Sequence, residues 1–378
     1  MALYEGIALI QEKQAVVLDL GTDYTKFGFT GEAAPRCIIP SEYWCAAERR
    51  HKRVYDYKDV EELYDNLVHM LHILYFRHVL VNPKERKVVV VESLFTPTQF
   101  RETLAKVLFL HYEVSGVLWA DSPRLCALTL GAPVVLVVSL GAEEAEAVAV
   151  VHGCPVLRAM QSAALGARAV QRELAALLAR DRAAAPPPAR ALEDIAVRAC
   201  FVPGRARAQA LRQGAEPARG AAYSRAGCSL HVSGAARELA AEPLFARDNE
   251  MASLPDIILQ CIVQCPIDAR RALAENILVC GGGAALPGLR ARLAQELRHL
   301  AALPPYCERV RADFRFHSAP APPNAVAWLG GALAGAADGG ARALARDAYL
   351  RAPRLRDWPC LLHTTPPAHH HWRDARDA

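Results

Sequence analysis

Along this chain, continuous apolar runs of strand length alternate with segments whose apolar residues would lie on one face of a helix. Continuous apolar runs of strand length begin at Val16, Val88 and Val117, and such runs are typical of strands that are buried on both faces. After the second run, Thr96 or Thr98 can cap a helix that would bury Phe100, Leu104, Val107 and Leu108 on one face. Strands that alternate with helices in this way predict an α/β fold with a mixed, covered sheet.

The same alternation continues in the C-terminal half. Ser253 and Pro255 mark the start of a helix and Pro266 marks its end. A second helix is expected to run to about Glu275, followed by a short strand at 277–280 that ends in three glycines. The pattern therefore predicts another strand that leads directly into a glycine-rich turn.

An internal repeat is the most informative feature. The stretch VVLDLG at 16–21 is echoed by LVVSLG at 136–141, and an outgoing strand is expected after each. A repeat of this kind predicts two similar sheet-containing halves. Two glycine turns that face each other across a cleft would present backbone N–H groups to a polyphosphate. Each turn could also be an ordinary tight hairpin, but a third glycine site, GGGAALPG at 281–288, favours a nucleotide cleft.

Two regions depart from the globular pattern. Residues 175–241 are dominated by Ala and Arg, with few large apolar residues apart from the patch Ile195 to Val202. This composition predicts a weakly packed subdomain outside the main core. Residues 353–378 are polar and rich in Pro, Arg and His, which predicts a loose C-terminal tail.

Composition and charge narrow the class of protein. The 378 residues allow two domains, and the formal net charge of +4 is too small to argue for nucleic-acid binding. The N-terminus has no basic region, and no apolar run approaches the ~20 residues of a membrane span. Eleven cysteines occur without a C-x-x-C motif, which is typical of reduced thiols. We therefore expect a cytoplasmic protein that neither binds nucleic acid nor inserts into a membrane.

Four segments carry a family resemblance. The segment DLGTDYTKFGFTGEAAPR at 19–36 resembles the first phosphate loop of actin and the actin-related proteins. Residues 88–97 are similar to the family's strand, glutamate and helix entry, and the segment that begins at Cys265 resembles its adenosine-loop region. The stretch WLGG at 328–331 resembles the C-terminal return into the first domain. From about Val16 to Gly335, the chain is identified as a member of this family.

The resemblance implies a fold and domain boundaries. The expected fold is α/β and actin-like, a duplicated ribonuclease-H-like fold with two lobes around a nucleotide cleft. Lobe I would comprise residues 1–127 and 325–352, with a shortened subdomain 2 near 41–60. Lobe II would comprise residues 128–324 and include the Ala/Arg-rich subdomain at 175–241.

The resemblance also implies a cofactor, ATP or ADP with Mg²⁺, and the residues that would bind it. Asp19 matches the aspartate that holds the metal through water, and Lys26 matches the lysine that reaches the phosphates. The remaining matches are glycine-loop positions around the phosphates and under the adenosine: Gly21, Thr22, Asp23, Gly141, Gly281, Gly282 and Gly283.

Other positions depart from the family pattern. Ser139 replaces the second-loop aspartate and cannot supply its charge to Mg²⁺-bound water. Ser122 stands where the family has a glutamine that positions the attacking water, and it is too short for that role. Acidic and charged family positions are also lost at Ala142, Ala196 and Val197. Glu143 and Glu144, just beyond the second turn, are the only candidates to compensate. We therefore expect slow or absent hydrolysis, no catalytic residues, and a nucleotide that links the lobes.

Within the family, four segments are similar to the branch found at the pointed end of the dynactin complex: residues 4–6, 72–83, 264–268 and 324–331. This resemblance implies a non-enzymatic cap on an actin-like filament. Its partners would be the filament subunits and the pointed-end subunits of dynactin and, indirectly, dynein and cargo adaptors. The protein would be associated with the cytoskeleton and would not be a homo-oligomer.

The stretch after Pro40 bears on assembly. Residues 41–53 are too few to form the loop that an actin protomer inserts into its neighbour. Because a head-to-tail filament needs complementary faces on every subunit, a subunit without one face can join an end but cannot be extended. The shorter stretch could also be a trimmed loop without consequence. An actin-fold ATPase and a nuclear subunit of a chromatin remodeller are the alternative functions.

Overall fold

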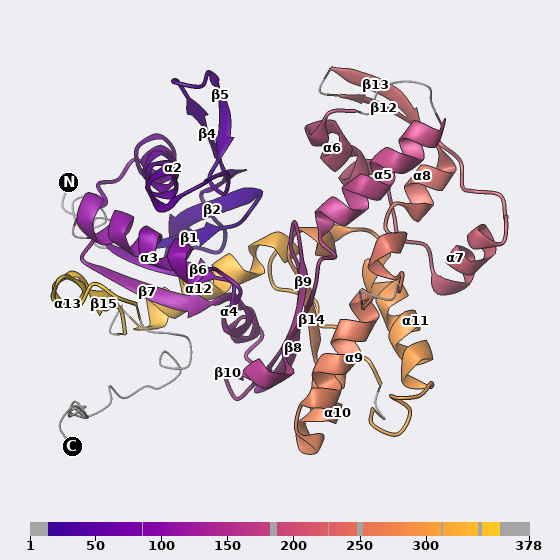
Figure 1. The fold of residues 1–378 in the computed structure, drawn as a ribbon. Helices are drawn as coiled ribbons and strands as arrows, with labels where there is room; N and C mark the ends of the chain where they lie inside the picture. Colours follow the sequence, from indigo (N-terminus) through magenta and orange to yellow (C-terminus); the bar gives the residue numbers. More distant parts are fainter. Residues whose placement is uncertain are drawn as a thin grey trace, which may run out of the picture.

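The computed structural model describes residues 14–84, 86–181, 187–225, 227–247, 252–310, 313–338 and 342–355. These residues form two α/β lobes (Figure 1), and the predicted α/β class is confirmed. The N-terminal stretch at 4–6 and most of the expected C-terminal tail lie outside the described residues.

The first lobe is built on a six-stranded sheet. Its strand order is β15-β7-β6-β1-β2-β3, with β1 antiparallel to β2 and parallel to β6, and β6 parallel to β7. The strands are β1 (Val16–Leu20), β2 (Tyr24–Phe29), β3 (Cys37–Pro40), β6 (Lys87–Glu92), β7 (Gly116–Asp121) and β15 (Leu344–Ala345). The continuous apolar runs are therefore interior strands, as the pattern predicted.

Helices cover both faces of this sheet, which explains the continuous apolar runs of β1, β6 and β7. Val16 and Leu18 pack in one cluster with residues of α2 (Val60–Ile73) and α3 (Thr98–Lys106). Val17 points to the other face, where it packs with Trp328 of α12 (Val326–Asp338). Helix α4 (Ser122–Leu128) contributes residues to this second face and also to a cluster with the other lobe.

The second lobe repeats the same hairpin arrangement. Its strands are β8 (Val134–Leu140), β9 (Ala145–Val151), β10 (Cys154–Pro155), β11 (Gln161–Ala163) and β14 (Ile277–Cys280). β8 is antiparallel to β9 and parallel to β14, just as β1 is antiparallel to β2 and parallel to β6. The internal repeat therefore corresponds to two hairpins with the same pairing. Next to β14, an isolated parallel bridge joins Ile277 to Phe316.

The helices of the second lobe begin and end near the predicted positions. A capping box of Ser253 and Asp256 starts α9 (Leu254–Gln264), and α10 (Ile267–Glu275) follows Pro266. Helix α11 (Leu289–Ala301) follows the glycine-rich turn. The remaining short helices are η1 (Leu74–Val79), η2 (Val107–His111), η3 (Leu157–Ala159), η4 (Glu242–Leu244), η5 (Gly282–Ala285), η6 (Pro323–Ala325) and α13 (Arg346–Arg351).

The Ala/Arg-rich stretch is better packed than its composition indicated. It forms α5 (Ala167–Asp181), α6 (Ala189–Ala199), α7 (Arg205–Arg212), α8 (Gly234–Leu239) and the hairpin β12 (Ala221–Arg225) to β13 (Cys228–Val232). Ile195, Val232 and Ala236 are fully buried and belong to the same core cluster as Leu136 and Val138 of β8. The prediction that this stretch lies outside the main core was wrong, because alanine faces can be buried with almost no loss of side-chain entropy.

The short stretch after Pro40 forms a separate hairpin. β4 (Glu42–Cys45) and β5 (Arg50–Arg53) pair antiparallel and project from the first lobe (Figure 1). The hairpin is held at its base, where the Tyr43 ring stacks on His69 of α2 at 4.7 Å between centroids. Trp44 on the next position is 57% exposed. Only the four residues 46–49 connect the two strands.

Candidate nucleotide cleft

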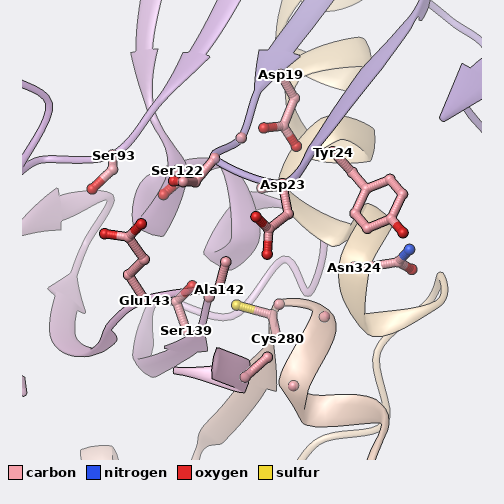
Figure 2. A pocket seen from close by; sticks show the side chains of 18 of the residues that line it. Asp19, Asp23, Tyr24, Ser93, Ser122, Ser139, Ala142, Glu143, Cys280 and Asn324 are labelled. Atoms are coloured by element: carbon pink, nitrogen blue, oxygen red, sulfur yellow. The ribbon is translucent and has the colours of Figure 1, made fainter. Parts of the chain in front are cut away.

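A cavity of about 690 Å³ lies between the two lobes, and residues of both lobes line it. Its volume lies in the range of sites that enclose a small ligand or cofactor. The structure brings all nine predicted site residues to this one cavity: Asp19, Gly21, Thr22, Asp23, Lys26, Gly141, Gly281, Gly282 and Gly283. Figure 2 shows the two hairpin turns approaching each other across it.

The turns after β1 and β8 have the same construction. The Gly21 N–H donates to Tyr24 O at 3.2 Å, and the Gly141 N–H donates to Glu144 O at 2.9 Å. A side chain at position 21 would not fit, because a Cβ atom there would lie 2.7 Å from Tyr24 O. Within the described residues, the backbone N–H groups at the two tips, 22–23 and 142–143, have no protein acceptor. Such paired tips are suited to bind an anion.

The glycine-rich turn after β14 packs closely against the second hairpin. Gly281 has a φ of +88°, and a Cβ atom there would lie 2.4 Å from Leu140 O. At Gly283, a Cβ atom would lie 2.6 Å from Leu140 Cδ2. Glycine is therefore required for backbone geometry at the first position and for space at both. In the part of the chain that the structure describes, the N–H groups of residues 282 and 283 also have no protein acceptor.

The cavity wall is strongly acidic. Among the described residues that line it there is one lysine, Lys26, whose Nζ lies 2.8 Å from Asp19 Oδ2. Seven carboxyl side chains line the same wall: Asp19, Asp23, Glu92, Glu143, Glu144, Glu146 and Glu193. Beside an anionic ligand, a bound cation would offset those of these carboxyl groups that remain charged.

An arginine joins the two hairpin turns. Arg168, in the first turn of α5, donates from Nη2 to Asp23 Oδ1 at 2.6 Å and from Nη1 to Glu143. Asp23 also accepts a hydrogen bond from Arg53 at the end of β5. The carboxylates on both turns are thus neutralised by arginines that approach from outside the cavity lining.

A comparison with protein families matches the actin family over residues 10–67, 58–198 and 229–344. The chain belongs to the actin family. Among curated relatives, it is 24% identical to actin-related protein 10 of Dictyostelium discoideum, with 91% of this chain and 87% of the relative aligned. It is 23% identical to actin-related protein 2 of Arabidopsis thaliana, over 76% of this chain and 82% of the relative. These similarities support an actin-related protein of the class of actin-related protein 10.

The positions that depart from the actin-family pattern also face the cleft. Ser122 begins α4 and Ser139 lies near the end of β8, and both line the cavity (Figure 2). Ala142, Ala196 and Val197 line it as well. Of the two nearby carboxylates, Glu143 is engaged by Arg168, and burial and the neighbouring Glu143 raise the pKa of Glu144. Neither replaces a carboxylate at position 139.

The acidic groups farther inside the cleft of this actin-family protein have altered protonation. Burial raises the pKa of Glu92 to about 7, although the Arg101 guanidinium opposes the rise. Burial also raises the pKa of Glu146 to about 7, opposed by a hydrogen bond that Ser93 Oγ donates to Glu146 Oε1 at 2.8 Å. Burial therefore favours the protonated form of both carboxyl groups more than water does.

Further side-chain contacts close the cleft above the cavity. Tyr24 of the first lobe donates from its hydroxyl group to Glu193 Oε2 of α6 at 2.9 Å, and Arg190 of α6 donates to Glu42 of β4. The sequence alone does not indicate these contacts or the Arg168 bridge. Arg168 and Asp23 are 145 positions apart, and Tyr24 and Glu193 are 169 apart, so no local pattern marks either pair.

The cavity fits a nucleotide in several respects. Three turns present backbone N–H groups that lack protein acceptors within the described residues, and glycines allow a close backbone approach to a ligand. No group of three or more His, Cys, Asp or Glu side chains among the described residues could hold a metal ion. In the expected role of Asp19, that residue would hold a Mg²⁺ ion through water, with phosphate oxygens as further ligands.

The described part of the chain also bears on membrane association. None of its helices is long and apolar enough to cross a membrane.

Proposed function

We propose that this actin-related protein is a non-enzymatic subunit that caps the pointed end of the actin-like filament in the dynactin complex. In this role it supports the smaller pointed-end subunits and contributes to dynein-driven transport at the cytoplasmic cytoskeleton. The similarity to actin-related protein 10 supports this choice within the actin family. So do the stretches 72–83 and 324–331, which resemble the pointed-end branch of the family.

The β4–β5 hairpin is the observation that carries the capping proposal. Four residues, 46–49, connect its strands, which leaves no long loop to insert into a following protomer. Growth of a head-to-tail filament requires that each added subunit present the next complementary face. A subunit with the shorter hairpin binds the filament through its opposite face and stops further addition.

In this proposal the nucleotide is a structural ligand. ATP or ADP with Mg²⁺ would bind between the turns that carry Gly21 and Gly141, with Lys26 near the phosphates and Asp19 near the metal through water. The glycine-rich turn at 281–283 would support the adenosine side. Because such a ligand touches both lobes, its binding stabilises the closed arrangement by linkage.

The wall of the cleft favours a scaffold over an ATPase. Ser139 and Ser122 both line the cavity, and neither can organise or polarise an attacking water as the family's aspartate and glutamine do. An active ATPase would need these groups replaced from elsewhere, and Glu143 is already bound by Arg168.

Assembly in cells tests the proposal. We expect the full-length tagged chain, recovered from cell extract after cross-linking, to be joined to dynactin pointed-end subunits. Electron microscopy of the recovered particles should place the tag at one end of a short filament. Recovery mainly with chromatin remodellers would overturn the proposal and favour the nuclear alternative, and a tag distributed along the filament would exclude a cap.

A further inference from the structure

The two hairpin turns each carry a carboxylate where they face one another. Asp23 lies at the tip of the first turn and Glu143 at the tip of the second, and Arg168 donates to both. Figure 2 shows Asp23 projecting from the first turn toward the second, where Ala142 lies. Charged side chains therefore occupy the gap between the two sets of unbonded N–H groups at 22–23 and 142–143.

This gap is where the last phosphate of a polyphosphate would lie if both turns held it. Both tips line the same cavity, and their backbone N–H groups could act as donors to its oxygens. A phosphate in that position would meet the carboxylates of Asp23 and Glu143. It would have to compete with both of them for Arg168, whose two terminal nitrogens are already engaged.

The charges on the rest of the cavity wall also disfavour a nucleotide with an additional phosphate. Among the described lining residues, Lys26 is the one cation, and it already pairs with Asp19. Each phosphate added to a nucleotide adds negative charge. A triphosphate therefore meets more repulsion in this cavity than a diphosphate, and like charges at close range in a partly buried site interact strongly.

We propose that the cleft selects a nucleoside diphosphate with a divalent cation and discriminates against the triphosphate. The bridge from Asp23 through Arg168 to Glu143 takes the place of the terminal phosphate and links the two turns without it. This inference rests on the proposed nucleotide site but is independent of the proposed place in dynactin. Asp23 is thus a specificity-determining residue, and Arg168 is the positioning residue that holds it.

Nucleotide competition tests the inference. ADP and ATP, each with excess Mg²⁺, would displace a fluorescent ADP analogue from the purified full-length chain. We expect ADP to bind at least about tenfold more tightly than ATP, which corresponds to about 1.4 kcal/mol. Asp23→Asn removes a negative charge at nearly constant size, so it should improve ATP binding more than ADP binding. The ratio of the ATP dissociation constant to the ADP dissociation constant should therefore fall severalfold.

Two further variants separate this mechanism from general loosening of the lobes. Arg168→Gln removes the arginine of Glu143 and leaves Asp23 with Arg53 alone, so it should weaken ATP binding more than ADP binding and increase the preference for ADP. Glu42→Gln removes the ion pair between Glu42 and Arg190, which also joins the lobes but does not line the cavity. It should leave the ratio unchanged, and thermal melts of all variants would verify folding.

The outcomes are distinct. Equal affinities for ADP and ATP would overturn the inference. So would an Asp23→Asn variant whose ratio of ATP to ADP dissociation constants equals that of the wild type. Failure to bind either nucleotide would overturn it too, while leaving the cross-linking test of the dynactin proposal unaffected. A preference for ADP that Asp23→Asn narrows and Glu42→Gln does not would support it.

Discussion

Glu146 is a buried carboxyl group that connects the two lobes. It belongs to β9 of the second lobe and accepts a hydrogen bond from Ser93, which follows β6 of the first lobe. Only 6% of the residue is exposed, and burial penalises its charged form. The pKa of this carboxyl group therefore rises from 4.5 to about 7.

This shift links folding stability to pH. The folded protein binds the proton of Glu146 more tightly than the unfolded chain does, since the folded pKa of about 7 exceeds the unfolded value of 4.5. The stabilisation from this proton is complete below pH 4.5 and is lost as the pH rises through about 7. Glu92, with a folded pKa of about 7, acts in the same direction.

We predict that Glu146→Gln, a neutral side chain of the same shape, raises the melting temperature at pH 8 by about 2 °C or more. At pH 5 it should have little effect, because Glu146 is then protonated in the folded protein. Thermal melts between pH 5 and 8 would measure the difference. Glu308→Gln, at an exposed position, is the control, and an equal effect of Glu146→Gln at both pH values would contradict the prediction.

At the scale of elements, α12 packs against one face of the first sheet. Trp328 is fully buried, and its Nε1 donates to Val17 O of β1 at 3.2 Å. One turn later, a Cβ atom at Gly331 would lie 2.8 Å from Val91 Cγ2 and 3.0 Å from Val17 Cγ1. The glycine thus allows the helix to approach β1 and β6 closely, and its low helix propensity is offset by this contact.

We predict that Gly331→Val destabilises the protein by about 1–3 kcal/mol, because the added methyl groups push α12 away from β1 and β6. Urea unfolding followed by tryptophan fluorescence would measure the loss. The matched control on the same helix is Leu333→Ala, since Leu333 is 42% exposed. Equal unfolding midpoints for Gly331→Val and the wild type would show that the helix can move without cost.

At the scale of the whole molecule, the two lobes meet in two ways: through polar side-chain contacts across the cleft, and through apolar packing of α4 and α12. The polar contacts are Arg168 with Asp23, Tyr24 with Glu193, and Arg190 with Glu42. In the apolar packing, α4 contacts both sheets and α12. A ligand in the cavity would add to a closed arrangement that side chains already maintain.

We predict that the purified protein neither polymerises nor releases phosphate at a measurable rate when incubated with Mg²⁺ and ATP. The short β4–β5 hairpin removes one assembly face, and Ser122 and Ser139 do not activate water. Sedimentation and a phosphate-release assay on the same sample would test both points, with skeletal actin as the positive control. A homopolymer that sediments would contradict the capping proposal. Phosphate release from ATP that Asp19→Ala abolishes would favour the ATPase alternative.

Much of the fold could be predicted because its signals are local. The paired stretches at 16–21 and 136–141 each hold a buried strand and a glycine turn within six residues, so the two hairpins were recognisable before their partners were known. The packing of the Ala/Arg-rich stretch could not be predicted from its hydrophobicity, because alanine-rich helix faces can also be buried. There, Ala236 and Ile195 join the core of the second lobe through close helix packing that composition does not reveal.

The candidate site likewise has parts that could be predicted from the sequence and parts that could not. Its glycines could be predicted because a turn that must approach a neighbouring backbone excludes a side chain, as at Gly281. The bridge from Asp23 to Glu143 could not be predicted, because Arg168 reaches Asp23 from 145 positions away. The raised pKa of Glu146 was equally hidden, because desolvation depends on everything that packs around the carboxyl group.

The sequence by itself determined the α/β class, the repeated hairpins, the three glycine turns and membership of the actin family, since each depends on residue type and short spacing. Only the tertiary structure decided which charges meet in the cleft, how acidic its wall is, and that the Ala/Arg-rich stretch completes a core. The physical reason is that burial and electrostatic interaction depend on distance in space, and the fold brings together side chains that lie more than a hundred residues apart.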